Sequence, residues 1–232
     1  MLAILHEDAH ILALNKPAPL LTQAPPGVPS LEALVKTYIK EKYAKPAGVY
    51  LGVPHRLDRP VSGVIVFARN SKSAHRLAEQ FQQHRVEKIY WALVHGQVQP
   101  EAGEWHDWLL KLPEEARTEV ADATTPSVKS ATLSYRVLTS LGDQSLLEIR
   151  PKTGRSHQIR VQAASRGHPI IGDELYGSTM AFGPPAVVPR DRVIALHARS
   201  LTLVHPSTWQ PMTFSAALPA YWPIGSGDAP KT

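Results

Sequence analysis

The order of strand-like and helix-like segments is the feature that most restricts the fold of this chain. Several runs of apolar and β-branched residues follow one another directly, without the steady alternation of strand and helix that builds a parallel sheet. This order predicts an α+β fold, in which helices flank a mixed, mostly antiparallel central sheet.

The strands are predicted from hydrophobic patterns. The continuous apolar run VIVFA, residues 64–68, predicts a strand buried on both faces. Alternating apolar residues predict a half-buried strand over 130–138. The remaining predicted strands cover 10–14, 88–95, 145–151, 200–204 and 211–217. The predicted loops cover 17–29, 97–104, 113–128 and 177–192.

Apolar residues at helical spacing predict two helices, over 30–43 with Ser30 as the N-cap and over 71–84 with Ser71 as the N-cap. A third helix is predicted over 156–167, where Gly167 provides a stop.

Composition limits the class of protein. The 232 residues are 43% hydrophobic, which is enough for a substantial core. We expect one domain over residues 1–225 and a disordered tail over 226–232. The sequence has no cysteine, which excludes a disulfide scaffold, a thiolate zinc site and a cysteine nucleophile. No segment has the length of a signal peptide or a membrane span, so we expect a cytoplasmic protein with no membrane partner.

The formal net charge of +5 suits a polyanionic partner such as RNA. Many soluble proteins carry a similar charge, so this observation alone does not decide between a nucleic-acid-binding protein and another class.

A single acid, Asp58, stands between Arg56 and Arg59 directly before the predicted buried strand. We expect the flanking positive charge to keep the carboxylate ionised, which suits a nucleophile or a base more than an acid. Read alone, the same residues also fit an ordinary surface turn.

Residues 150–166 form a second cluster, in which six basic side chains gather around a Thr-Gly turn and the predicted third helix. An arginine there could pair with a carboxylate from elsewhere in the chain. A solvated basic helix face is the simpler interpretation. The cluster consists of Arg150, Lys152, Arg155, His157, Arg160 and Arg166.

Taken together, five segments resemble the RluA-type pseudouridine synthase family, which isomerises uridine to pseudouridine in ribosomal and transfer RNA. The resemblance covers nearly the whole chain in order. It implies the pseudouridine synthase fold with an active-site cleft, no cofactor, no metal and no separate N-terminal RNA-binding domain. The segments are NKPAPLL (15–21), HRLDRPVSGVIVFARN (55–70), EKIYWALVHG (87–96), PKTGRSHQIRVQAASRGHPIIGDELYG (151–177) and LHARSLTLVHP (196–206).

The resemblance also implies the catalytic residues. Asp58 matches the catalytic aspartate and Tyr90 the active-site tyrosine. The arginine that pairs with the catalytic carboxylate falls on Arg160, with Arg155 as the second choice. Whether Asp58 attacks C1′ of the ribose or removes a proton from C2′ stays open.

The remaining implied roles concern a partner, structured ribosomal or transfer RNA, bound by a monomer. Arg56 is implied to hold the target base outside its stack, and His55 to support the loop around it. The family usually has an acid and a threonine before Ser-Gly, whereas this chain has Pro60-Val61, which puts the detail of this loop in question. The other candidate RNA contacts are Arg59, Lys152, Arg155 and His157.

Two rival hypotheses belong to other classes. His55, His157 and His197 could bind a metal, but none of the three stands in an HExxH or HxxxH spacing. A catalytically inactive RNA-binding or RNA-folding module on the same scaffold is the second rival.

Overall fold

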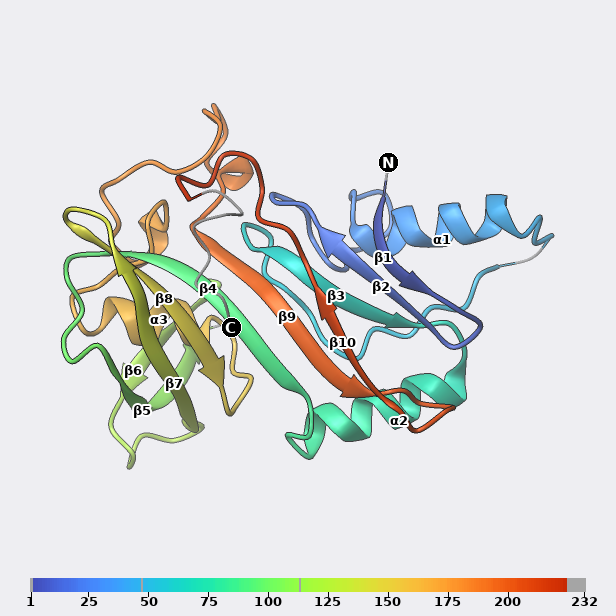
Figure 1. The fold of residues 1–232 in the computed structure, drawn as a ribbon, viewed down its shortest axis with the longest axis horizontal. Coiled ribbons are helices and arrows are strands. Elements are labelled where there is room, and N and C mark those ends of the chain that lie inside the picture. The colour runs from blue at the N-terminus through green and yellow to red at the C-terminus, as the bar shows by residue number, and fades with distance from the viewer. Residues whose placement is uncertain (1, 47, 113, 225–232) are drawn as a thin grey trace. The chain divides into compact units, whose positions relative to one another are not determined.

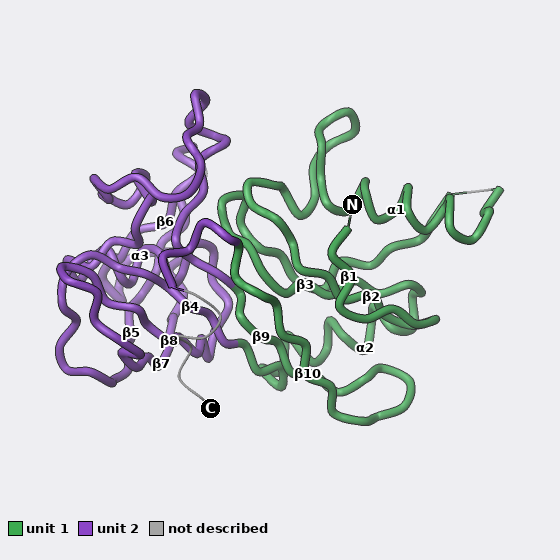
Figure 2. The backbone as a smooth tube through the Cα atoms, turned by 45° about the horizontal axis from the view of Figure 1, so that its top comes forward, with its two compact units in different colours: residues 1–88, 198–219 green, residues 89–197, 220–232 purple. Residues whose placement is uncertain are grey.

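The computed structural model describes residues 2–46, 48–112 and 114–224. The expected tail over 226–232 lies outside them. The chain divides into two compact units (Figure 2): residues 1–88 with 198–219 form unit 1, and residues 89–197 with 220–232 form unit 2.

Unit 1 contains a sheet in the order β1-β2-β3-β9, and β10 pairs with β9. The pairs β1–β2, β2–β3 and β9–β10 are antiparallel. Two helices lie above and below β1–β3 in the view of Figure 1. The elements are β1 (Ala3–Glu7), β2 (Ile11–Lys16), α1 (Leu31–Lys42), β3 (Ser62–Ala68), α2 (Ser71–Gln82), β9 (Leu196–Val204) and β10 (Pro211–Ser215).

The core of unit 1 forms where α2 packs on the sheet. Every residue of β3 is buried, as the apolar run predicted. Leu77 of α2 joins a buried cluster drawn from β2, β3, β9, β10 and the residues directly before β4 and after β10. The cluster consists of Ile11, Ala13, Val64, Val66, Ala68, Leu77, Val86, Leu201, Leu203, Phe214 and Ala216.

Unit 2 contains a sheet in the order β4-β8-β7-β5-β6, in which each neighbouring pair is antiparallel. The first two residues of β4 and the last seven of β9 are counted in unit 1. The elements are β4 (Glu87–His95), β5 (Ala102–Leu112), β6 (Arg117–Ala121), β7 (Lys129–Ser140), β8 (Gln144–Pro151), α3 (Gln158–Ala164), and the short 3₁₀ helices η1 (Glu174–Tyr176) and η2 (Pro189–Asp191).

These elements confirm the expected α+β class, with a mostly antiparallel sheet and helices against it. Two loop predictions were wrong: 97–104 contains the start of β5, and 113–128 contains all of β6. β6 is an edge strand that pairs only with β5 among the strands described. One side of an edge strand faces solvent, so a polar composition does not argue against it.

The helix boundaries differ from the predictions in detail. Ser30 caps α1 as expected, and its hydroxyl accepts from the Ala33 N–H. The predicted cap of α2 was wrong by one residue, because the side chain of Asn70 accepts from the Ser73 N–H. The third helix covers only Gln158–Ala164. No helix in the described part of the chain is both long and apolar enough to span a membrane.

Candidate active site

Asp58 lies in a turn directly before β3 and is half-buried. The Val61 N–H donates to the Asp58 carbonyl oxygen at 3.1 Å, which closes the turn. Leu57 and Val61 are buried on either side of it. The turn is therefore anchored in the core at both ends while the acid between them reaches the surface.

The segment after β2 holds this turn by hydrogen bonds on both sides of Asp58. The Leu20 N–H donates to the Arg59 carbonyl oxygen at 3.0 Å. The Thr22 hydroxyl donates to the Leu57 carbonyl oxygen at 2.8 Å and accepts from the Leu57 N–H at 3.1 Å. Because the residues before and after Asp58 are both bonded, the backbone at position 58 has little freedom.

Lys16 lies beneath the same turn and is fully buried, with 0% of its surface exposed. Its Nζ donates to three carbonyl oxygens: Leu20 at 2.7 Å, Pro17 at 3.1 Å and Arg59 at 3.3 Å. A lysine ammonium has three N–H donors, so these carbonyls match its full hydrogen-bonding capacity.

The charge of Lys16 is coupled to Asp58. Burial lowers the pKa of Lys16 to about 7, and the negative charge of Asp58 acts in the opposite direction. The carboxylate therefore has a buried cation close enough to interact with it electrostatically. This role could not be predicted from residue spacing, because a lysine between a strand and a proline is usually the exposed end of the strand.

The structure explains why the motif has a glycine, Gly63, after Asp58. Its φ of +117° is unfavourable for any residue with a side chain. A Cβ at this position would lie 2.3 Å from the Ala198 carbonyl oxygen, so β3 and β9 approach too closely for one.

His55 lies under the loop and contacts the core of unit 1. Its Nε2 accepts from the Val66 N–H at 3.0 Å, and its ring stacks on Phe81 with centroids 4.5 Å apart. Burial lowers the pKa of His55 to about 3, with a further contribution from the charge of Lys88. The imidazole is therefore neutral at physiological pH and is placed to support the loop. Arg56 is exposed and Arg59 is half-buried.

In unit 2, Arg160 forms a buried ion pair that the sequence did not predict. Its Nε and Nη2 donate to the two carboxylate oxygens of Asp173 at 2.6 and 2.8 Å. Its guanidinium carbon also lies 5.0 Å from the centre of the Tyr176 ring. This bidentate geometry fixes the plane of the guanidinium. The pairing of Arg160 with Asp58 stays a prediction.

The other basic candidates of unit 2 surround the start of α3. The ring of His157, at the N-cap position, is hydrogen-bonded through Nδ1 to the Tyr176 hydroxyl at 2.8 Å. Arg155 donates from Nε to the Ser130 carbonyl oxygen at 2.9 Å. Lys152 is exposed and forms an ion pair with Glu104.

Tyr90 lies near the start of β4, is half-buried, and pairs with Ile149 of β8. The structure thus gathers His55, Arg56, Asp58 and Arg59 in unit 1, and Tyr90 and the basic cluster of 152–160 in unit 2. Among the described residues, no three His, Asp or Glu side chains are grouped as a metal site.

Comparison with known proteins identifies the family. A model of the RNA pseudouridylate synthase family matches residues 10–165. The chain is 34% identical to tRNA pseudouridine synthase C of Salmonella typhimurium (strain LT2), over 96% of this chain and 87% of that protein. It is also 34% identical to the dual-specificity RNA pseudouridine synthase RluA of Haemophilus influenzae, over 93% of this chain and 92% of that protein.

A solved structure, human RNA pseudouridylate synthase domain containing 4, superimposes with a TM-score of 0.77. It is 25% identical and is matched over 94% of this chain and 89% of its own. The matched family model covers the Asp58 turn, Tyr90 and Arg160. The chain therefore belongs to the RNA pseudouridylate synthase family, whose members are isomerases that act on uridine in RNA.

Proposed function

We propose that this chain converts specific uridines of structured RNA to pseudouridine, and that the Asp58 carboxylate reacts at the ribose. The observation that carries the proposal is the buried ammonium of Lys16, which bonds the Asp58 turn and places a positive charge near the carboxylate. An acid that reaches the surface from a turn held in this way is placed to meet a substrate.

The reaction breaks an N-glycosidic bond, rotates the uracil and joins C5 of the base to C1′ of the ribose. The carboxylate can attack C1′, or it can remove the proton from C2′. Both routes start from the unprotonated acid, so the same electrostatic support serves either one.

Unit 2 supplies the other two proposed catalytic groups. Tyr90 is assigned to contact or exchange a proton with the base, and Arg160 to pair with the Asp58 carboxylate. The bidentate bonds from Asp173 hold the Arg160 guanidinium in one orientation, which suits such a role.

The proposed substrate is a transfer or ribosomal RNA in the cytoplasm, bound by a monomer. The relatives named above are a tRNA-modifying enzyme and a dual-specificity enzyme. A uridine in folded RNA must leave its stack before its sugar is accessible, at a cost of a few kcal/mol. The exposed Arg56 lies two residues before Asp58 in the sequence and is assigned to hold the extruded nucleotide.

The proposal is tested with purified protein and RNA labelled with tritium at C5 of uridine. Formation of the new bond at C5 releases the tritium into water. We expect release from transfer RNA or large-subunit ribosomal RNA isolated from cells that lack the gene. If the protein binds these RNAs but releases no tritium from any of them, it is an RNA-binding module without activity and the proposal is wrong.

A further inference from the structure

The loop between β9 and β10, residues 205–210, presents a tryptophan to solvent. Trp209 is 60% exposed and its φ is +62°, a conformation that residues with side chains rarely adopt. The loop is closed by two backbone hydrogen bonds: the His205 N–H donates to Gln210 at 2.8 Å, and the Trp209 N–H donates to His205 at 3.1 Å.

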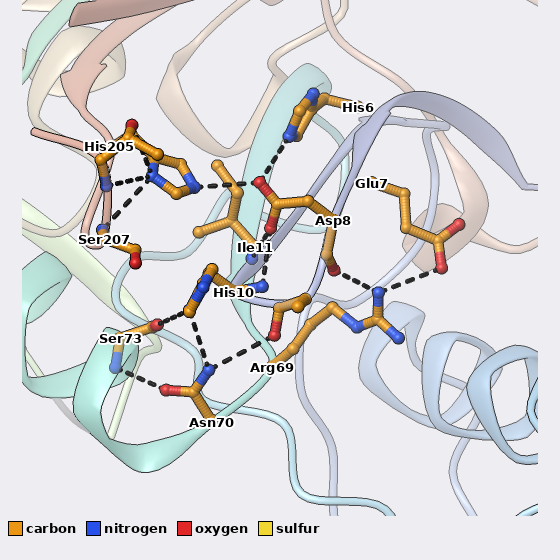
Figure 3. A network of polar contacts seen from close by, with 12 residues as sticks. His6, Glu7, Asp8, His10, Ile11, Arg69, Asn70, Ser73, His205 and Ser207 are labelled. Carbon is orange, nitrogen blue, oxygen red and sulfur yellow. Dashed lines mark hydrogen bonds and ion pairs between the residues drawn. The ribbon is translucent and has the colours of Figure 1, made fainter. Parts of the chain in front are cut away.

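His205 fixes this loop from beneath. It is 3% exposed, and its Nδ1 accepts from the Ser207 and Thr208 N–H groups at 3.3 and 3.0 Å. Because Nδ1 accepts, the ring proton is on Nε2, which donates to the Asp8 carboxylate at 2.9 Å. The other oxygen of Asp8 accepts from the N–H of Ile11 at 2.8 Å, so the loop is tied to the start of β2 (Figure 3).

Arg76 of α2 holds the loop from the side. Its Nη1 donates to the Pro206 carbonyl oxygen at 2.5 Å, and its guanidinium carbon lies 4.7 Å from the centre of the Trp209 ring. The indole thus stacks on a cation that is itself bonded to the loop, while most of the ring stays in solvent. Several hydrogen bonds, made by Arg76 and His205, therefore hold one exposed aromatic ring in place.

The charges near the ring favour an anionic partner. Lys72 lies one turn before Arg76 on α2, and His75 lies directly before it; both are exposed. Glu79, one turn after Arg76, is an exposed acid. The net positive charge of this face suits a phosphate backbone. An aromatic ring beside such charges is the usual platform for an unpaired nucleobase, since every base has a face to stack.

We propose that Trp209 and Arg76 form a stacking site for an unpaired base of the RNA substrate, away from the uridine that is modified. This inference depends on RNA being the substrate, as in the proposed function. The register of β2 with β3 separates the two places: Lys16 pairs with Gly63 at the Asp58 end, and Ile11 pairs with Ala68 at the end near His205. Five residues of strand span about 17 Å, so a different nucleotide must occupy each place.

The test measures binding of the transfer and ribosomal RNAs to three variants. Trp209→Ala should weaken binding by about 5- to 150-fold, and Trp209→Phe, which keeps a stacking face, by much less. Trp108→Ala is the matched control, because Trp108 is also partly exposed but lies in β5, without such a loop. Trp108→Ala should bind the same RNAs as tightly as the parent protein does.

A second measurement keeps the test valid if Trp209→Ala folds poorly. RNA stacked on Trp209 should quench its fluorescence, and Trp209→Phe should remove that part of the quenching. Equal affinity of all variants, or quenching that Trp209→Phe leaves intact, would overturn the proposal. If Trp209→Ala lost binding to a protein partner but still bound RNA as tightly as the parent protein, the proposal would also be overturned. The assay does not depend on catalysis, so RNA binding through Trp209 without tritium release would refute the proposed function alone.

Discussion

Lys16 and Asp8 are the ionisable side chains at the two ends of the β2–β3 pair in unit 1. The fold disfavours the charged form of Lys16 and favours the charged form of Asp8. At one end Lys16 is fully buried, and its pKa is lowered to about 7 because burial removes its water. At the other end burial would raise the pKa of Asp8, but hydrogen bonds from His6, Ile11, His10 and His205 outweigh it and hold the pKa below the usual range.

The charge on Asp8 stabilises the folded protein, whereas the charge on Lys16 destabilises it. The ionised form of Asp8 is favoured by the folded protein, so Asp8 stabilises the fold at neutral pH. The charged form of Lys16 is disfavoured by the folded protein, so keeping it charged at neutral pH reduces stability. The proposed reaction of Asp58 gives the costly buried cation beneath its turn a functional reason.

Among the substitutions at the two ends of the β2–β3 pair, the largest effect is expected for Lys16→Met, which keeps the length of the side chain and removes the charge. The rate of the chemical step should fall about 100-fold, because the turn loses its bond to Arg59 and Asp58 loses the nearby cation. RNA affinity should change little. Single-turnover kinetics measure the rate, and Lys36→Met, which removes an exposed partner of Glu32, is the control.

Lys16→Met also tests whether the buried charge lowers the free energy of unfolding. Because the pKa of Lys16 is lowered on folding, the unfolded protein binds the extra proton between pH 7 and 10.5, and stability should rise with pH in this window. The slope contributed by one proton is at most about 1.4 kcal/mol per pH unit. Urea unfolding should show that Lys16→Met lacks this contribution. A variant with full activity and an unchanged slope would remove the contrast between the two ends.

A smaller effect, on stability alone, is expected for Asp8→Ala. Two backbone N–H groups and two histidine rings lose their acceptor, which should lower the free energy of unfolding by about 2 kcal/mol. The depressed pKa means that this stabilisation is present above about pH 4, and is lost as the pH falls further and the native carboxylate is protonated. Urea unfolding at pH 7 and pH 3 measures the difference.

Asp122→Ala is the control for this variant, since the Asp122 carboxylate accepts from the N–H and the hydroxyl of the neighbouring Thr124 in an exposed turn. Equal destabilisation by both substitutions would show that Asp8 has no special place in the fold.

The sequence predicted the parts of the fold that depend on local patterns. The apolar run of β3 and the helical spacing of α1 were sufficient, because each pattern has one simple way to bury its residues. The edge strand β6 was missed because only one of its five residues is buried and its pairing with β5 is not a local property. The cap of α2 was displaced because Ser71 and Asn70 are both good capping residues.

The candidate site also has parts that the sequence predicted and parts that it did not. The motif around Asp58 could be found from the resemblance alone, and the structure adds how the turn is held. Lys16 and Asp173 were missed because their roles arise from contacts that residue spacing does not encode: three carbonyls around one ammonium, and a carboxylate 13 positions after Arg160. Neither residue stands out by composition, since lysine and aspartate are usually exposed.

The most direct test of the account is Asp58→Asn, which changes one carboxylate oxygen to an amide and keeps the shape of the side chain. We expect tritium release from RNA to fall by more than about 1000-fold, because the reacting group is gone. Binding of the same RNA should stay within a few-fold of the unmodified protein. If Asp58→Asn forms pseudouridine at a rate close to that of the parent protein, another group performs the reaction and the central claim fails.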